Sequence, residues 1–277
     1  MLRRIVAPNP GPFTFHGTGT YVIGHGEVAI VDPGPDDPGH IDALMNALDG
    51  ERVTHILATH THRDHSPGCR LLKPFTDAPA YGHGPHGLGR ILHDEAVEEG
   101  ADLEFSPDIR VRSGDIIEGS GWSVECVHTP GHTSNHVCYQ LREEQALLCG
   151  DHVMAWSTSI ISPPDGSLSV YLESLRLLLD RDDRIYWPCH GASIPDPGPF
   201  VRSYIDHRHQ RIRQVRSCLQ NKLHHIDSMV PEIYTHLPDH MYPAAARSIL
   251  STLIYLIDNG EAVADSVSLD GSFASTG

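Results

Sequence analysis

The most unusual feature of this 277-residue chain is a short segment in which histidine and aspartate crowd together. Residues 59–65 read Thr-His-Thr-His-Arg-Asp-His and follow directly on residues 53–58, an apolar run that predicts a strand. Imidazole and carboxylate groups together suit zinc and similar divalent ions. His60 and His62 share one face of an extended chain. Asp64 and His65 are adjacent and point differently, so the segment could serve two neighbouring ions.

Three further predicted strands are each followed by a residue that can bind a metal ion. His132 follows the Pro-Gly turn after residues 122–127, and Asp151 follows the apolar residues 146–149. His190 follows residues 185–189 and precedes a glycine. A carboxylate buried after an apolar strand is costly unless it is paired or metal-bound, so Asp151 could bridge two cations. The predicted ligands are five histidines and two aspartates: His60, His62, Asp64, His65, His132, Asp151 and His190.

Several neighbours of these ligands are expected to have other roles. We expect His128 and His136 to support the site rather than bind metal, and His152 to be a neighbour only. Cys189 precedes His190 on a strand and should face away from it. The six cysteines form no C-x-x-C pair, which predicts reduced, buried thiols.

The surrounding pattern predicts an α/β sandwich built on sheets. Short apolar runs bounded by turn residues predict many strands, and helical spacing predicts fewer helices. The strands are expected at residues 20–23, 27–31, 53–58, 79–81, 109–112, 122–128, 136–141, 146–149 and 185–189, and the helices at residues 40–48, 66–72 and 168–179.

The pattern changes after residue 199. A long helix at about residues 200–222, a segment at 229–234, a helix at 244–256 and a strand at 262–264 outline a small winged-helix module. We therefore predict a catalytic domain at 1–199, a helical winged-helix-like domain at 200–268 and a flexible, Gly- and Ser-rich tail at 269–277. Such a module often serves packing or dimerisation, so a homodimer is one expectation.

Charge and composition exclude some classes of function. The formal net charge of −16 opposes broad binding to nucleic acid or to anionic membranes, although two bound divalent ions would add four positive charges at the site. No run reaches the roughly 18 to 20 apolar residues that a membrane helix needs. No apolar stretch follows the first arginines, so we expect no signal peptide and a cytoplasmic location.

The four histidine and aspartate segments resemble the metallo-β-lactamase superfamily over roughly residues 15–195. That resemblance implies an αββα sandwich with the metal site at one edge. It implies that His60, His62 and His132 hold one ion, that Asp64, His65 and His190 hold the other, and that Asp151 bridges them.

A narrower resemblance covers nearly the whole chain. Residues 9–15, 31–35, 62–68 and 190–196, with the His-Arg-x-x-Arg helix at 207–211 and the winged-helix end, look like the lactamase-beta-like 2 group. That group joins a metallo-β-lactamase domain to a C-terminal winged helix. It includes a mitochondrial endoribonuclease, and some fungal relatives are acyl-carrier thioesterases.

The ligand set predicts a two-metal hydrolase with two Zn²⁺ ions per chain, iron or manganese being alternatives. We expect a metal-bridging hydroxide to attack the substrate and Asp64 to accept the proton. A carbonyl ester or thioester of a small molecule is the first substrate expectation, and single-stranded RNA cut by an endoribonuclease is the alternative. Iron-dependent oxidoreductase chemistry, β-lactam hydrolysis and a non-catalytic DNA-binding regulator rank lower.

Two segments are candidates for substrate contact. The resemblance implies that Phe13, Phe15 and residues 156–158 flank the site, so they could line a pocket or could be ordinary packing. The basic helix from Arg202 to Arg216 could hold a phosphate or carboxylate, or could be a solvated helix paired with an acidic body.

Overall fold

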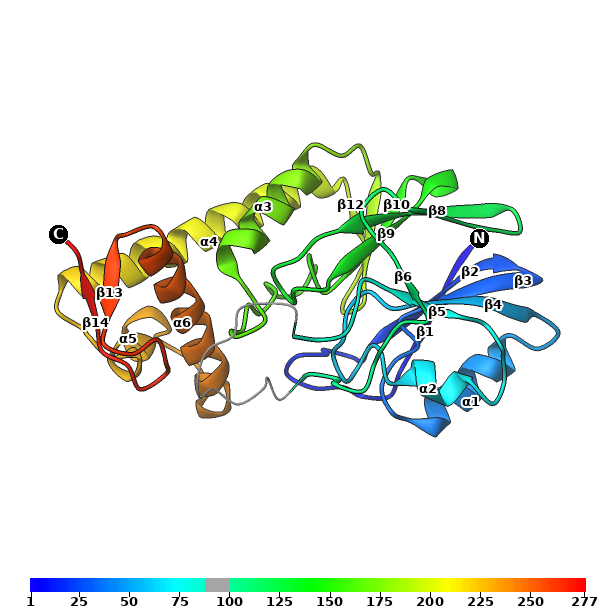
Figure 1. The fold of residues 1–277 in the computed structure, drawn as a ribbon, viewed down its shortest axis with the longest axis horizontal. Helices are drawn as coiled ribbons and strands as arrows, with labels where there is room; N and C mark the ends of the chain where they lie inside the picture. Colours follow the sequence, from blue (N-terminus) through cyan, green and yellow to red (C-terminus); the bar gives the residue numbers. More distant parts are fainter. Residues whose placement is uncertain (88–99) are drawn as a thin grey trace.

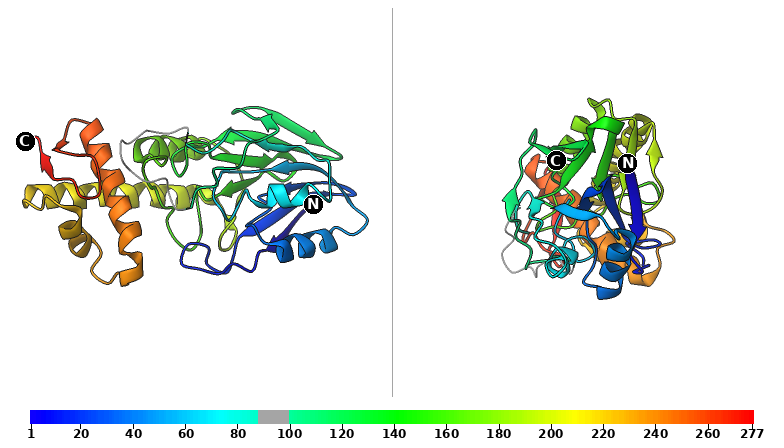
Figure 2. Two further views of the ribbon diagram at one scale, coloured as in Figure 1. Left: turned by 60° about the horizontal axis from the view of Figure 1, so that its bottom comes forward. Right: turned by 90° about the vertical axis from the view of Figure 1, so that its right-hand side faces the viewer.

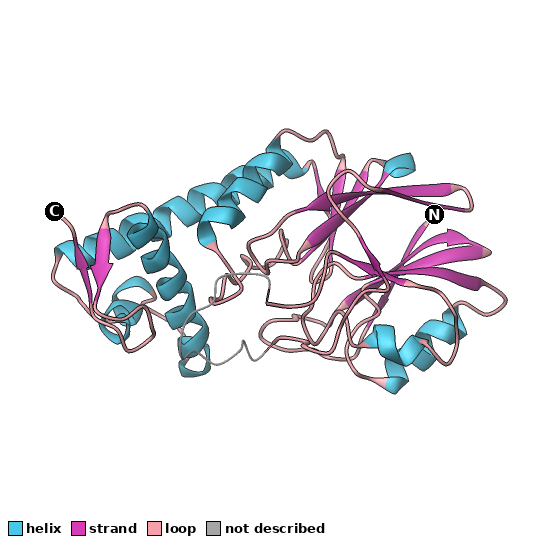
Figure 3. Cartoon of the chain, viewed as in Figure 1, coloured by secondary structure: helices cyan, strands magenta, loops and turns pink. Residues whose placement is uncertain are grey.

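The computed structural model describes residues 1–87 and 100–277, which form two six-stranded sheets packed face to face with helices on both outer faces (Figure 1, Figure 3). The side chains between the sheets include Tyr21, Ile23, Val124 and Tyr139, all buried. The predicted αββα sandwich is confirmed.

The first sheet has the order β1-β2-β3-β4-β5-β6, with β1 to β3 antiparallel and β3 to β6 parallel. Its outer face is covered by α1 (Pro38–Ala47) and α2 (Gly68–Leu72), which bury Ile41, Leu44 and Leu72 against it. The strands are β1 (Leu2–Val6), β2 (Gly19–His25), β3 (Glu27–Val31), β4 (Arg52–Leu57), β5 (Ala80–Gly82) and β6 (Ile109–Arg110).

The second sheet has the order β12-β11-β10-β9-β8-β7, and only β10 and β11 are parallel neighbours. Helix α3 (Leu168–Leu179) and the first half of α4 (Pro197–Gln220) cover its outer face. The strands are β7 (Ile116–Gly119), β8 (Trp122–His128), β9 (Val137–Leu141), β10 (Ala146–Gly150), β11 (Ile185–Pro188) and β12 (Ile194–Pro195), with the short helix η1 (Arg142–Glu144) before β10.

Helix α4 runs on without a break from the sandwich into the C-terminal module (Figure 2). There it packs on α5 (Ile226–Ile233), α6 (Tyr242–Asp258) and β14 (Phe273–Ser275). The short helix η2 (Asp239–Met241) and strand β13 (Ala262–Ala264) pack on α6. One apolar core extends from Leu147 and Tyr186 of the second sheet through α3 and α4 to Leu253 of α6. The two modules therefore share a core, which fixes α6 relative to the sandwich.

The C-terminal residues are more ordered than expected. We expected residues 269–277 to form a flexible tail, but Phe273–Ser275 pair with β13 as strand β14. The Phe273 side chain is buried in the shared core, and its carbonyl oxygen lies 2.7 Å from Nδ1 of His224. A buried aromatic side chain anchors this strand despite its polar neighbours.

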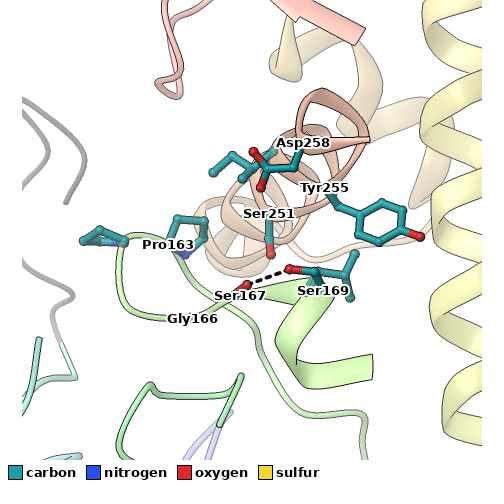
Figure 4. A pocket seen from close by; sticks show the side chains of 10 residues that line it. Pro163, Gly166, Ser167, Ser169, Ser251, Tyr255 and Asp258 are labelled. Carbon is teal, nitrogen blue, oxygen red and sulfur yellow. Dashed lines mark hydrogen bonds between the residues drawn. The ribbon is translucent and has the colours of Figure 1, made fainter. Parts of the chain in front are cut away.

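A small hollow of about 60 Å³ marks the second contact between the modules (Figure 4). Ser251 and Tyr255 of α6 line one side, and the turn from Gly166 to Ser169 that begins α3 lines the other. Together with α4, this contact ties α6 to the second sheet.

The cysteines and the helices can be compared with the sequence analysis. All six cysteines are free and buried. Within residues 1–87 and 100–277, no helix combines the length and the apolar character needed to cross a membrane.

Candidate metal centre

The predicted ligands converge at one edge of the sandwich, where the loops after β4, β8, β10 and β11 meet. Four groups of side chains there have potential ligand atoms within 4.8 Å of one another. The groups are His60, His62 and His132; His60, His65 and Asp151; Asp64, His65 and His190; and Asp32, His65 and Cys189.

In the first group, three imidazole nitrogens face one another. Nδ1 of His62 lies 3.0 Å from Nε2 of His60 and 3.1 Å from Nε2 of His132. Burial and then the neighbouring histidines hold the pKa of His60 well below its usual value. Neutral imidazoles with converging lone pairs are the form that binds a divalent cation.

The hydrogen bonds behind the rings select the tautomer that a metal site needs. Nδ1 of His132 donates to the carbonyl oxygen of Ile160 at 2.6 Å, and Nδ1 of His190 donates to that of Gly17 at 3.3 Å. A neutral ring whose Nδ1 carries the proton presents a lone pair at Nε2. The carboxylates beside His190 raise its pKa to about 10, so a cation bound there would displace the proton from Nε2. In both rings it is therefore Nε2 that faces the cluster.

The second group surrounds the two aspartates. Nε2 of His190 lies 3.2 Å from Oδ2 of Asp64 and 3.3 Å from Oδ1 of Asp151. Burial lowers the pKa of His190, but the charge of Asp151 and hydrogen bonds to both carboxylates outweigh it and raise the pKa to about 10. Nε2 of the buried His65 lies 3.2 Å from Asp64 Oδ2 and makes no hydrogen bond. An orphaned nitrogen beside two carboxylates fits a cation position.

Asp32 holds the two groups together, and the sequence argument did not select it. Its carboxylate is fully buried and accepts hydrogen bonds from Thr59 N and Thr59 Oγ1, both at 2.7 Å, and from His65 Nδ1 at 3.0 Å. Thr59 Oγ1 donates its proton to Asp32, so at 2.9 Å it accepts from Nδ1 of His60. Asp32 thus orients two predicted ligands. The pattern that selected Asp151, a carboxylate directly after an apolar strand, is also present at Asp32 and could have identified it.

Two glycines allow the ligand loops to approach their neighbours. Gly150 has φ +50°, and a Cβ there would lie 2.6 Å from Nε2 of His136. Gly131 has φ +134°, and its Cβ would lie 2.3 Å from the Cα of Tyr171. Both positions need glycine, because other residues would clash and would be strained at positive φ.

The flanking histidines His128, His136 and His152 belong to none of the four groups, whereas Cys189 belongs to the group with Asp32 and His65. Nε2 of His136 accepts a hydrogen bond from the backbone N of Asp151 at 3.3 Å. His128 stacks on His83 with ring centroids 3.8 Å apart, and the buried His152 packs on Tyr171. Cys189 Sγ lies 3.0 Å from Asp32 Oδ2, next to His65 and on the inner side of the site.

Three of the five arginines between Arg202 and Arg216 contact other residues of the protein. Arg208 of α4 is buried, donates to the carbonyl oxygen of Ser159 and lies over the Tyr171 ring. Arg211 lies over the Tyr234 ring, and Arg216 forms an ion pair with Glu261. These three guanidinium groups are thus engaged within the protein.

Helix α4 holds the loop that follows Asp151. Tyr204 OH accepts from Met154 N at 2.9 Å and contacts the carbonyl oxygens of Met154 and Ser157. The hydroxyl of Ser159 in turn lies within hydrogen-bond distance of the carbonyl oxygens of Asp151 and His152. The C-terminal module therefore helps to position Asp151.

A cavity of about 380 Å³ opens on the metal-ligand cluster. Its walls are mostly apolar, and it falls in the size range of small-molecule sites. Phe13 and residues 156–158 line it as expected, whereas Phe15 stacks on Trp156 with centroids 5.0 Å apart. The sequence argument missed the walls that come from elsewhere in the chain: Arg63, Met154, Ile160, Met241, Ala244 and Arg247.

Residues 14–190 match the Metallo-beta-lactamase superfamily. The chain belongs to this superfamily. Residues 226–267 match the Beta-lactamase associated winged helix domain. The chain thus joins a metallo-β-lactamase superfamily domain to a C-terminal winged helix, as the sequence resemblance implied.

Several relatives are similar to this chain in sequence. The Lactamase-like protein adaB of Aspergillus niger is 31% identical over 223 residues, which cover 78% of this chain and 63% of that protein. This chain therefore spans less than two-thirds of that relative's length. An Atrochrysone carboxyl ACP thioesterase of Aspergillus chevalieri is 32% identical over 78% of this chain and 65% of its own length. The Beta-lactamase-like protein 2 homolog of Drosophila melanogaster is 30% identical over 93% of this chain and 88% of its own.

The fold also matches solved structures. A metallo-beta-lactamase family protein of Thermus thermophilus superposes with a TM-score of 0.80 at 20% identity, covering 99% of this chain and 98% of that one. At this identity the match supports the fold alone.

Proposed function

We propose that this protein is a dinuclear zinc hydrolase that cleaves a thioester of a small or carrier-bound acyl group. The observation that carries the proposal is the apolar cavity that opens directly on the histidine and aspartate cluster. The thioesterase name carried by relatives at about 32% identity supports the same substrate class.

We assign His60, His62 and His132 to one ion, Asp64, His65 and His190 to the other, and Asp151 to a bridge between them. Nδ1 of His62 lies 3.0 Å from Nε2 of His60 and 3.1 Å from Nε2 of His132, which is close enough for one ion to contact all three nitrogens. The nitrogen and oxygen donor set also suits zinc better than a soft or an all-oxygen ion.

Bound divalent ions would supply a water of lowered pKa and a positive field for the oxyanion that develops at the carbonyl. The protein's own part is to orient and to move protons. Asp64 lines the cavity, which supports its assignment as the group that would accept a proton from the attacking water. Thr18 Oγ1 donates to Asp64 Oδ2 at 2.9 Å, and Asn9 in turn holds Thr18 through its side chain. The N-terminal loop therefore fixes the angle at which Asp64 meets the substrate.

Cleavage of single-stranded RNA is the competing function, and the structure offers it less support. Phosphate backbones are bound by free lysine and arginine side chains. Arg208, Arg211 and Arg216 of α4 instead contact other residues of this chain. The formal net charge of −16 also opposes binding to RNA.

The test combines elemental analysis with two substrates. We expect two zinc ions per chain, turnover of an acyl-coenzyme A thioester, and no cleavage of bis(p-nitrophenyl) phosphate or single-stranded RNA. Two zinc ions with RNA cleavage and no thioester turnover would replace the thioesterase proposal with the nuclease. One iron per chain with neither activity would refute the hydrolytic zinc centre.

A further inference from the structure

The geometry points to the first turn of α6 as the element that sets which acyl group the enzyme accepts. We propose that the cavity holds a bulky, largely apolar acyl group and that Ala244 sets its size limit. This inference rests on the thioester hydrolysis proposed above and goes beyond it by assigning the acyl class and a specificity-determining residue.

The cavity has three kinds of wall. His62, Asp64, His132, Asp151 and His190 form its base, where the bond must be cleaved. Apolar side chains from the sandwich form one flank, and the winged-helix module forms another. The flanking apolar residues are Phe13, Met154, Trp156 and Ile160 from the sandwich, and Met241 and Ala244 from the module.

The α6 wall cannot easily retreat. Ala245 and Ile249, on the neighbouring face of the helix, are 6% and 2% exposed and belong to the core shared with α3 and α4. Figure 4 shows that the later part of α6 also packs on the turn that begins α3. Close-packed interiors resist displacement. A larger side chain at position 244 must therefore take volume from the cavity rather than push the helix aside.

The apolar part of the lining favours the acyl side of the thioester over the thiol side. A coenzyme A or acyl-carrier arm carries amides that need hydrogen-bond partners, and Phe13, Met154 and Trp156 offer none, so burying the amides against them carries a cost. An apolar acyl group that covers these side chains removes apolar surface from water, which favours binding. Arg63 and Arg247 supply polar groups elsewhere in the lining. The aromatic surfaces of Phe13 and Trp156 suit a planar acyl group as well as an aliphatic one.

The test uses three thioesters of N-acetylcysteamine: acetyl, hexanoyl and 2-naphthoyl. For the unaltered protein we expect kcat/KM to rise at least tenfold from acetyl to 2-naphthoyl. We expect Ala244→Trp to lower the ratio of kcat/KM for the 2-naphthoyl thioester to kcat/KM for the acetyl thioester at least tenfold, because the indole occupies the space of the acyl group. Ala244→Leu should lower it by a smaller factor, and it serves as the second variant if the tryptophan variant fails to fold.

The matched control is Tyr242→Trp, which adds a similar ring on the same helical turn. Tyr242 is exposed and does not line the cavity, so the ratio should stay within twofold of the unaltered protein. If the unaltered protein hydrolyses all three thioesters with equal kcat/KM, or if Ala244→Trp and Ala244→Leu leave the ratio unchanged, the acyl assignment is wrong while the thioesterase function stands. If no thioester is hydrolysed at all, the proposed function fails and the acyl assignment fails with it.

Discussion

Replacing Asp32 with asparagine isolates the group that orients His65. Oδ2 of Asp32 accepts hydrogen bonds from Thr59 Oγ1 at 2.7 Å and from His65 Nδ1 and Cys189 Sγ at 3.0 Å. Oδ1 accepts from Thr59 N at 2.7 Å. An amide has only one oxygen, so in either orientation its NH₂ group faces at least one of these donors.

The expected size of the effect follows from these contacts. One buried donor left without an acceptor costs about 1–3 kcal/mol of unfolding free energy. Loss of the carboxylate behind a metal-binding imidazole typically lowers metal affinity about 10- to 100-fold. We therefore expect Asp32→Asn to lose about 1–3 kcal/mol in the metal-free state and to bind zinc about 10- to 100-fold more weakly.

The two effects are measured separately. Denaturant unfolding of the metal-free protein gives the stability change, and competition with a chromophoric chelator gives the zinc affinity. Asp36→Asn is the matched control, because Asp36 is exposed and lies four residues further along the chain. Zinc affinity equal to that of the unaltered protein would show that Asp32 does not position His65, and the reasoning above would be refuted.

Three further predictions address the site and its support. Asp64→Asn should lower kcat at least about 100-fold, the scale of a lost proton acceptor, with a near-normal unfolding transition; normal turnover at full metal content would remove Asp64 from its proposed role. Tyr204→Phe should cost about 1–3 kcal/mol of stability, because Met154 N loses its acceptor, whereas Tyr242→Phe at the exposed start of α6 should cost almost nothing in the same denaturation assay. Chelation should lower the thermal midpoint, since a ligand at 100 times its Kd stabilises by about 2.7 kcal/mol; a midpoint that chelator does not move would contradict a metal bound only by the folded state.

The secondary structure was largely predictable, and the misses share a cause. The expected helix at 168–179 is α3, and the expected strand at 122–128 is β8. Strands β1, β7, β12 and β14 were not predicted. They are two to five residues long, and each lies at a sheet edge or in the small hairpin, where pairing with a neighbour rather than local pattern decides the conformation.

The chemistry-bearing residues were visible in the sequence because each sits directly after an apolar strand. Strands β10 and β11 are parallel neighbours, so Asp151 and His190 had to lie at the same edge of the second sheet. His60 follows β4 of the first sheet and joins them only because of how the two sheets pack. The same rule, applied to the strand ending at Val31, would have selected Asp32. The sequence could not predict which nitrogen of each histidine ring faces the cluster, because this depends on hydrogen-bond partners in distant loops, such as the carbonyl oxygens of Ile160 and Gly17.

The sequence by itself determined a sheet-based α/β sandwich, the winged-helix outline and the seven residues that meet at the strand ends, because periodicity and spacing are local properties of the chain. The αββα arrangement was implied by the family resemblance. Only the tertiary structure decided what surrounds the seven residues. It buried Arg208 against Tyr171 and Ser159 rather than leaving it for a substrate, and it brought Ala244 to the cavity beside Asp64, 180 positions earlier in the chain. Such contacts arise from how one shared core packs α4 and α6 on the second sheet, and no local pattern encodes that packing.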